Sequence, residues 1–194
     1  PPVCFCRLCS EGRQGGHRSV IEESFRRNRL VCLPDGQSAE GTGWAGMIET
    51  VTFDTIMQAA EIHSESWKES HKAICSPAFL ERHTPEYQRA HLEERVAKGA
   101  RLYMLSVEKP VGIVSVHGSL IENLYILPGE QNKGYGTQLL AFAVQRCVGT
   151  PVCWVLHTND GARRFYERNG FQWTGNRVDR TETLYELEYR LCRI

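Results

Sequence analysis

The sequence predicts an α/β protein in which a mixed central sheet is flanked by helices. Stretches with the two-residue period of strands alternate along the chain with stretches of helical period. A glycine-containing loop, residues 131–137, stands between one strand-like stretch and a leucine-rich helical one. No internal repeat or low-complexity array breaks the pattern, so a single mixed sheet is the economical interpretation.

The composition of the 194-residue chain changes near Met47. Residues 1–46 hold six arginines, seven glycines and no lysine, whereas all five lysines and all three methionines lie from Met47 onward. We therefore expect residues 1–46 to be an extension outside the core: poorly ordered, left from cloning, or translated from an upstream region. Residues 47–194 are expected to form one domain, since about 150 residues suffice to bury a core.

The overall charge is balanced, with 23 basic and 23 acidic side chains. No general field gathers nucleic acid or an anionic membrane, so neither is expected as a partner. No run reaches the roughly 18 apolar residues of a membrane span, and the sequence predicts a soluble, cytoplasmic protein. The eight cysteines are interpreted as reduced thiols.

One group of residues in the extension has metal-binding chemistry. Cys4, Cys6, Cys9 and His17 offer thiolates and an imidazole. Structural zinc sites show two well-spaced ligand pairs, and the second pair is missing here. We therefore predict no metal site.

The first half of the domain contains one strand, then helices, then three strands. The strand covers residues 47–53, and an amphipathic helix follows over 55–67. Ser76-Pro77 and Thr84-Pro85 each place a capping residue before a proline, which predicts two further helix starts, the second helix ending at 98–99. The three strands are expected at 101–107, 111–117 and 120–127.

The second half of the domain begins with the glycine-containing loop. A helix is expected at 135–147, a strand at 152–157 and a helix at 161–168, before two closing strands near 171–175 and 183–191.

The loop between the strand 120–127 and the next helix predicts an anion site. A helix N-terminus presents unpaired N–H groups and the positive end of its dipole, and glycine lets a phosphate approach the backbone. A Walker loop would end in Gly-Lys-Ser/Thr, and a dinucleotide-binding loop would carry three glycines after a first strand. Neither pattern is present.

Two motifs indicate a family. Gln131, Gly134 and Gly136 form Q-x-x-G-x-G, and residues 159–171 read N-x-x-A-x-x-F-Y-x-x-x-G-F. Both resemble blocks of the GNAT N-acetyltransferase superfamily, and the resemblance spans residues 47–194 in element order. It implies the GNAT acyl-CoA N-acyltransferase fold and acetyl transfer from acetyl-CoA, with no metal.

The same resemblance implies which residues contact the coenzyme. They include Asn159, which binds the pantetheine arm or only caps its helix, and Phe165, which lies on a core-facing side of the same helix. The full predicted set is Leu124, Tyr125, Ile126, Gln131, Asn132, Lys133, Gly134, Tyr135, Gly136, Thr137, Asn159 and Phe165.

Acetyl transfer to an amine needs a base, an oxyanion donor and an acid for the leaving thiolate. Glu122 is the candidate base, acting directly or through water, and strand alternation puts it on the face of Leu124 and Ile126. A surface glutamate is the alternative reading. His117 and His157 are reserve candidates. Tyr166 is the candidate acid by resemblance, and the Ile126 N–H is the candidate oxyanion donor.

The expected acceptor is a primary amine of a small molecule or peptide, attacking directly in a ternary complex. Cys147 and Cys153 are expected in the core and not as acyl carriers. Residues 64–92 should shape the acceptor site, where Glu65, Glu69 and Glu86 either attract a cation or form a solvated face. The rival is a non-catalytic acyl-CoA-binding domain, and a homodimer is left open.

Overall fold

The computed structural model describes residues 46–192. Cys4, Cys6, Cys9 and His17, and with them nearly all of the expected extension, lie outside this range. The described elements are β1 (Met47–Thr50), α2 (Ile56–His71), α3 (Pro77–Glu81), α4 (Pro85–Ala97), β2 (Arg101–Val107), β3 (Lys109–His117), β4 (Leu120–Ile126), η1 (Pro128–Glu130), α5 (Tyr135–Arg146), β5 (Val152–Leu156), α6 (Asp160–Arg168), β6 (Phe171–Asp179) and β7 (Tyr185–Leu191).

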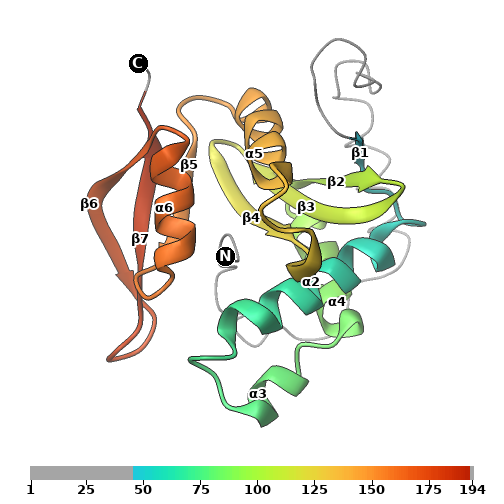
Figure 1. Cartoon of the computed structure of the whole chain (residues 1–194), viewed down its shortest axis with the longest axis horizontal. Coiled ribbons are helices and arrows are strands. Elements are labelled where there is room, and N and C mark those ends of the chain that lie inside the picture. The colour runs from blue at the N-terminus through green and yellow to red at the C-terminus, as the bar shows by residue number, and fades with distance from the viewer. Residues whose placement is uncertain (1–45, 193–194) are drawn as a thin grey trace.

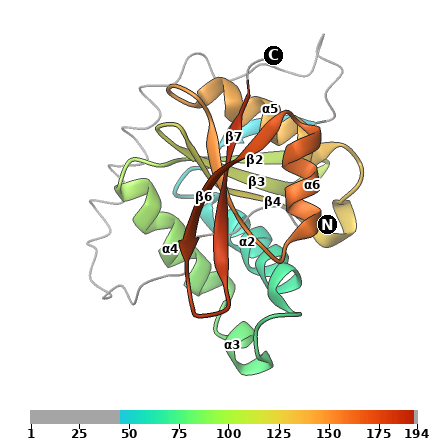
Figure 2. The same ribbon diagram turned by 90° about the vertical axis from the view of Figure 1, so that its left-hand side faces the viewer.

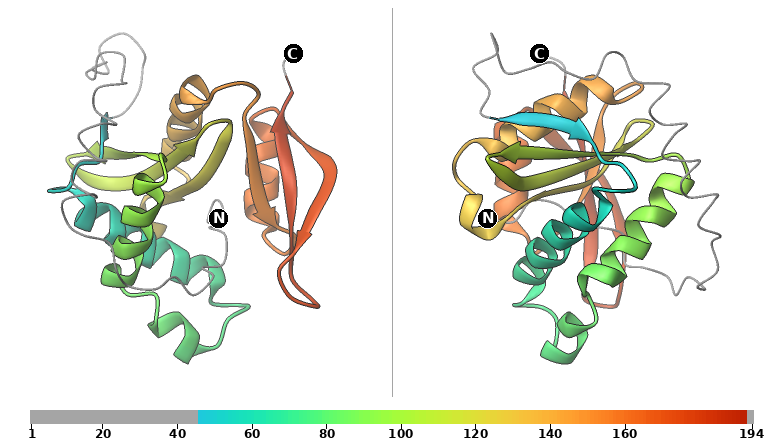
Figure 3. Two further views of the ribbon diagram at one scale, coloured as in Figure 1. Left: turned by 180° about the vertical axis from the view of Figure 1, so that it is seen from behind. Right: turned by 90° about the vertical axis from the view of Figure 1, so that its right-hand side faces the viewer.

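The seven strands form one mixed sheet in the order β1-β2-β3-β4-β5-β7-β6. All neighbours are antiparallel except β4 and β5, which are parallel. Helices lie on both faces, with α5 on one side of β2–β4 and α2 and α4 on the other (Figures 1 and 3). The predicted α/β class with a mixed, helix-flanked sheet is confirmed.

The core divides into two clusters, one on each face of the sheet. The first packs α5 and α6 against the strands and includes Leu124, Ile126, Leu139 and Tyr166. The second packs α2 and α4 against β2–β4 and includes Ile56, Trp67, Leu92, Leu102 and Tyr125. Tyr125 therefore faces α2, while its neighbours on β4 face α5.

Both predicted proline-led helices form as the capping pattern requires. The Ser76 hydroxyl accepts the Phe79 N–H at 3.3 Å, and the Thr84 hydroxyl accepts the Tyr87 N–H at 3.2 Å. Each bond satisfies one of the N–H groups that a helix start leaves free. In the described residues, no helix is long and apolar enough to cross a bilayer.

Element ends differ from the expectation by three or more residues in three places. β1 ends at Thr50, three residues early, because the Thr52 N–H donates to the Thr55 hydroxyl at 2.9 Å and turns the chain. α2 continues four residues beyond Trp67 to His71. β6 runs on to Asp179 across an irregularity between Trp173 and Arg177, and its pairing with β7 forms a long arm (Figure 2).

Candidate active site

The parallel strands β4 and β5 separate soon after they meet. Their ladder consists of the single pair Leu120 and Val152. β5 then pairs with β7 along its whole length. The remainder of β4, up to Ile126, therefore has no partner strand on its β5 side among residues 46–192.

We call the side of β4 that β5 leaves beyond Leu120 and Val152 the opening. The pairing of β3 with β4 shows which backbone groups of β4 face it. The Leu127 N–H donates to the Val111 carbonyl at 2.9 Å, and the same register pairs Gly112 with Ile126. Hydrogen-bonded and non-bonded pairs alternate in an antiparallel ladder. The N–H groups of Ile126 and Leu124 therefore point away from β3, toward the side where β5 has diverged. The Tyr125 N–H points toward β3.

The predicted anion loop leads from this strand into α5. Gly134 is the N-cap of α5 with a φ of 88°, and Asn132 also has a positive φ of 63°. The first intrahelical bond runs from the Gln138 N–H to the Gly134 carbonyl at 3.1 Å. The N–H groups of Tyr135, Gly136 and Thr137 are thus the ones that a helix start leaves for an anion.

Side chains of the loop are held by local contacts. The Gln131 amide donates to the Ile126 carbonyl at 3.2 Å. The exposed Lys133 ammonium bonds to the half-buried Glu130 carboxylate at 2.8 Å, and this contact raises the pKa of Lys133 and lowers that of Glu130. Gln131 therefore ties the loop to the strand end, which leaves the backbone as the main anion ligand.

We predict that Gly134→Val raises the dissociation constant of acetyl-CoA at least tenfold, or about 1.4 kcal/mol. A β-branched residue is strained at this positive φ, although a Cβ at Gly134 meets no atom within 4 Å. The first turn of α5 must shift to relieve the strain, which moves the N–H groups. Calorimetry on folded protein measures the effect, and Gly149→Val, a second open glycine with φ 84°, is the control. Equal affinities in both variants would refute the loop assignment.

Asn159 and Phe165 lie on α6 as the motif predicts. The Asn159 side chain accepts the Ala162 N–H at 3.0 Å, so it caps the helix. The Phe165 ring packs close to Gly136, since a Cβ there would lie 3.3 Å from its Cε2 atom. Gly136 thus lets the start of α5 approach Phe165, which places this ring beside the anion loop.

Tyr166 is fully buried in the cluster formed by α5, α6 and the sheet. Its ring makes edge contacts with Phe165 and Phe171, each at a centroid distance of 5.3 Å. Leu124 and Ile126 belong to the same cluster. Tyr166 is therefore on the α6 side of the opening, opposite the side covered by α2.

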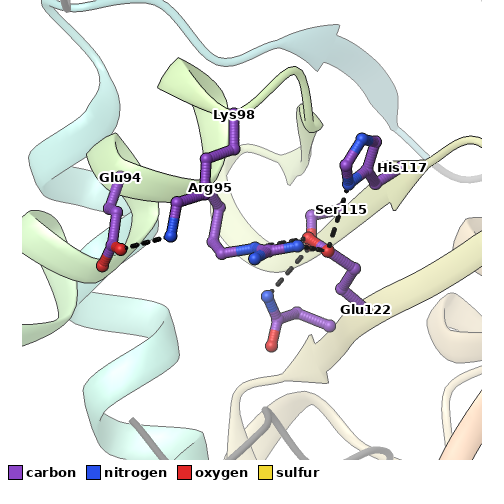
Figure 4. Close-up of polar contacts among 7 residues, drawn as sticks. Glu94, Arg95, Lys98, Ser115, His117 and Glu122 are labelled. Carbon is purple, nitrogen blue, oxygen red and sulfur yellow. Dashed lines mark hydrogen bonds and ion pairs between the residues drawn. The ribbon is translucent and has the colours of Figure 1, made fainter. Parts of the chain in front are cut away.

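Glu122 lies at a β-bulge that the sequence did not reveal. Ser115 pairs with Asn123 but Val116 pairs with Ile121, so Glu122 is the extra residue on β4. A bulge interrupts alternation. Glu122 contacts Arg95 of α4 (Figure 4), so the prediction that it shares the face of Leu124 and Ile126 was wrong.

Arg95 binds Glu122 through two of its nitrogens. The Arg95 Nε donates to Glu122 Oε2 at 3.2 Å, and an Arg95 terminal nitrogen donates to Oε1. The Glu122 side chain is only 8% exposed, whereas that of His117, whose Nδ1 lies 3.7 Å from Oε1, is 45% exposed. A two-point pair of this kind fixes the carboxylate and stabilises its ionised form.

The side chain of His157, a reserve candidate for the base, packs against Tyr185. Its ring stacks on Tyr185 at 3.9 Å, and its Nδ1 lies 3.2 Å from the Tyr185 carbonyl oxygen. The structure therefore brings His117, but not His157, to Glu122.

A surface groove lies beside the expected acceptor helices. It has a volume of about 470 Å³, and its walls come from α2, α3 and the start of η1. The lining residues are Glu65, Lys68, Glu69, Lys72, Leu80, Glu81 and Pro128. Acidic and basic side chains alternate here, and Lys72 binds Glu69 at 2.5 Å, so the groove does not select a cation by charge alone.

Sequence reasoning missed three residues on α2 and α4 that the fold brings to β4. The Ser66 hydroxyl donates to the Ile126 carbonyl at 3.2 Å, and Arg95 holds Glu122. His63 is fully buried and lies against Tyr125. The sequence feature that could have identified His63 is its place in the apolar stripe of the helix predicted at 55–67.

A family model describes the central part of this architecture. Residues 94–173 match the acetyltransferase (GNAT) domain. They run from α4 to the start of β6 and contain the opening, the anion loop and α6. None of the curated proteins compared with the chain matches it.

Solved structures share the fold. The PaiA N-acetyltransferase of Thermoplasma acidophilum in complex with coenzyme A is 18% identical with a TM-score of 0.60, over 75% of this chain and 98% of that one. YjaB of Escherichia coli in its apo form is 21% identical with a TM-score of 0.58, over 78% and 100%. A GCN5-related N-acetyltransferase of Rhodopseudomonas palustris is 18% identical with a TM-score of 0.58, over 77% and 97%.

Residues 94–173 are therefore similar to a GNAT acetyltransferase domain. The sheet with its flanking helices has the GNAT fold that these solved structures share.

Proposed function

We propose that the protein transfers the acetyl group of acetyl-CoA to a primary amine of a small molecule or peptide by direct attack in a ternary complex. One observation carries the proposal: the N–H groups of Leu124 and Ile126 face the side where β5 has diverged, and the same strand leads to the N–H groups that begin α5. A pantetheine arm has amides that pair with a strand, and its pyrophosphate suits a helix N-terminus. The coenzyme-A complex of the PaiA neighbour supports the choice of coenzyme.

The residues around the opening have different roles in the proposed reaction. The loop backbone from Asn132 to Thr137 holds the pyrophosphate, and Phe165 packs beside it. The Ile126 N–H donates to the thioester oxygen as negative charge develops there, which stabilises the tetrahedral intermediate. The Gln131 and Ser66 bonds to the Ile126 carbonyl fix the next peptide group, between Ile126 and Leu127, and so help to hold the end of β4 in place.

The two faces of the sheet assign opposite roles to the remaining groups. α5 and α6 pack against one face of the sheet, and α2 and α4 pack against the other. In the proposal Tyr166, on the α6 side, protonates the departing thiolate, and the amine lies on the side of α2 and α4. Glu122, on the α4 side, is the sequence-derived candidate for the amine proton, and it serves that role only if Arg95 releases one of its oxygens.

A thiol-release screen with acetyl-CoA over aminoglycosides, polyamines, amino acids and short peptides tests the proposal. We expect at least one amine to release coenzyme A with acetylation of its nitrogen. Tight acetyl-CoA binding without release for every amine would favour the alternative, a non-catalytic acyl-CoA-binding domain.

A further inference from the structure

His63 of α2 is a buried imidazole that the fold leaves without hydrogen bonds. Its exposure is 0%, and within residues 46–192 neither ring nitrogen has a hydrogen-bond partner. A buried polar group without a partner destabilises the folded protein. A side chain in this state is expected where a ligand completes its hydrogen bonds.

His63 lies close to the predicted position of the thioester. Ser66, one helical turn along the same face of α2, donates to the Ile126 carbonyl at 3.2 Å. The His63 ring is 4.8 Å from the ring of Tyr125, the residue before Ile126. One turn of helix rises about 5.4 Å. His63 is therefore about one turn along α2 from Ser66, the residue that contacts the Ile126 carbonyl.

A second buried polar atom faces the same side of β4. Asn123 is fully buried and donates to the Ser115 hydroxyl at 3.0 Å, but its Oδ1 atom has no partner among residues 46–192. Two-residue alternation places Asn123 on the face of Tyr125, toward α2. A fully buried imidazole on α2 and a fully buried amide oxygen on β4 therefore lie on this side of the sheet, both without a hydrogen-bond donor or acceptor partner among residues 46–192.

Glu122 is less suited than His63 to take a proton. Its carboxylate is bound at both oxygens by Arg95, and this pair joins α4 to the β4 bulge. Protonating Glu122 would leave the Arg95 guanidinium without its counter-charge. Removing the charge of one partner from a pair that is largely shielded from water is destabilising, because the other charge loses its partner.

We propose that His63 receives the proton of the attacking amine, an inference that rests on the proposed acetyl transfer. The neutral amine nitrogen forms a bond to the thioester carbon, and the carbonyl electron pair moves to oxygen. An N–H proton passes to a ring nitrogen of His63. The oxyanion then re-forms the carbonyl, the carbon–sulfur bond breaks, and the thiolate takes a proton from Tyr166.

The surroundings of His63 keep it in the form that accepts a proton. Burial lowers its pKa well below the usual value, and nearby His91, His83 and His71 lower it further. The facing groups are Tyr125 from β4 and His91 from α4, with Arg95 one turn beyond His91. His63 is therefore neutral at pH 7.

In the proposal the proton leaves His63 through His91. The ring of His91 lies 5.9 Å away by centroids, and His91 is only partly buried. His91 can relay the proton to solvent, after which a proton returns to Tyr166. The net reaction consumes no proton beyond the one that the amine supplies.

Three variants in the full-length protein test the proposal, with the best acceptor from the thiol-release screen. His63→Gln is expected to lower kcat about a hundredfold with an unchanged dissociation constant for acetyl-CoA, and to lose the acidic limb of the pH–kcat profile. Glu122→Gln is expected to lower the melting temperature, and its loss of kcat should be smaller than that of His63→Gln. His71→Gln, which removes another buried imidazole from α2, is the matched control and should keep kcat.

The outcomes distinguish His63 from Glu122 as the group that receives the amine proton. Wild-type kcat in His63→Gln would overturn the proposal, and a hundredfold loss confined to Glu122→Gln would return the role to Glu122. A wild-type protein without transfer to any amine would instead contradict the proposed function itself. If His63→Gln does not fold, ¹⁵N chemical shifts of the His63 ring in the wild type decide: a neutral ring from pH 8 to 6 agrees, and a charged ring at pH 7 overturns it.

Discussion

Replacing Tyr166 by phenylalanine should lower kcat about a hundredfold, and the affinity for acetyl-CoA should stay unchanged. Phenylalanine keeps the ring that packs at 5.3 Å against Phe165 and Phe171 and removes only the hydroxyl. The lost step is donation of a proton to the thiolate, so higher pH should not restore activity. Steady-state kinetics with the best acceptor and calorimetry with acetyl-CoA measure the two quantities.

Tyr189→Phe is the matched control for Tyr166→Phe. The Tyr189 hydroxyl accepts a bond from Arg163 at 3.2 Å and donates to Glu167 at 3.0 Å, so its loss removes a structural contact. This variant should keep wild-type kcat with slightly lower stability. Wild-type turnover in Tyr166→Phe would remove Tyr166 from the mechanism and leave positioning and backbone polarisation as the main sources of rate.

The free energy of unfolding should fall steeply as the pH drops from 6.5 to 4.5. Four imidazoles are packed into the layer of α2 and α4, where Trp67 stacks on His71 at 4.0 Å and on His83 at 3.6 Å. Burial lowers the pKa of His71 and of His91 to about 4, and it lowers the pKa of His63 well below its usual value. The folded protein therefore resists protonation that the unfolded chain accepts.

The direction of this pH dependence follows from the number of protons that the folded and the unfolded protein bind. Between pH 6.5 and 4 the unfolded chain binds more protons, so stability is present above pH 6.5 and is lost as the pH falls toward 4. A shift of this size corresponds to about 3 kcal/mol for one histidine. Urea denaturation at pH 7.5, 6.0, 5.0 and 4.5 measures the loss, and His71→Phe, which preserves an aromatic stack on Trp67, should reduce it. A constant free energy over this range would contradict the packing of neutral imidazoles.

Periodicity predicted the elements well because their burial follows local pattern. The caps at Ser76 and Thr84 set two helix starts, and strand alternation located β2 to β5 within a few residues. The position of the glycine-containing loop at the start of α5 could also be predicted, since it depends on consecutive residues around Gly134. Ends set by side-chain turns, such as the one at Thr52, escaped the pattern.

Side-chain direction at β4 could not be predicted, because it depends on pairing between strands. One extra residue at the bulge moves Glu122 to the face of α4, and nothing in the order of residues marks that position. His63 was missed for a related reason. A histidine in an apolar stripe is usually a packed core residue, and only the tertiary contacts with Tyr125 and His91 show what surrounds it.

Acetyl transfer itself is tested most directly with acetyl-CoA that carries ¹³C in the acetyl group. Protein, labelled coenzyme and the amine panel are mixed, stopped in acid and analysed by mass spectrometry. The account predicts the label on an amine nitrogen of the acceptor, free coenzyme A in equal amount, and no acetyl group on the protein. Calorimetric binding of acetyl-CoA with no labelled acceptor from the whole panel would contradict it.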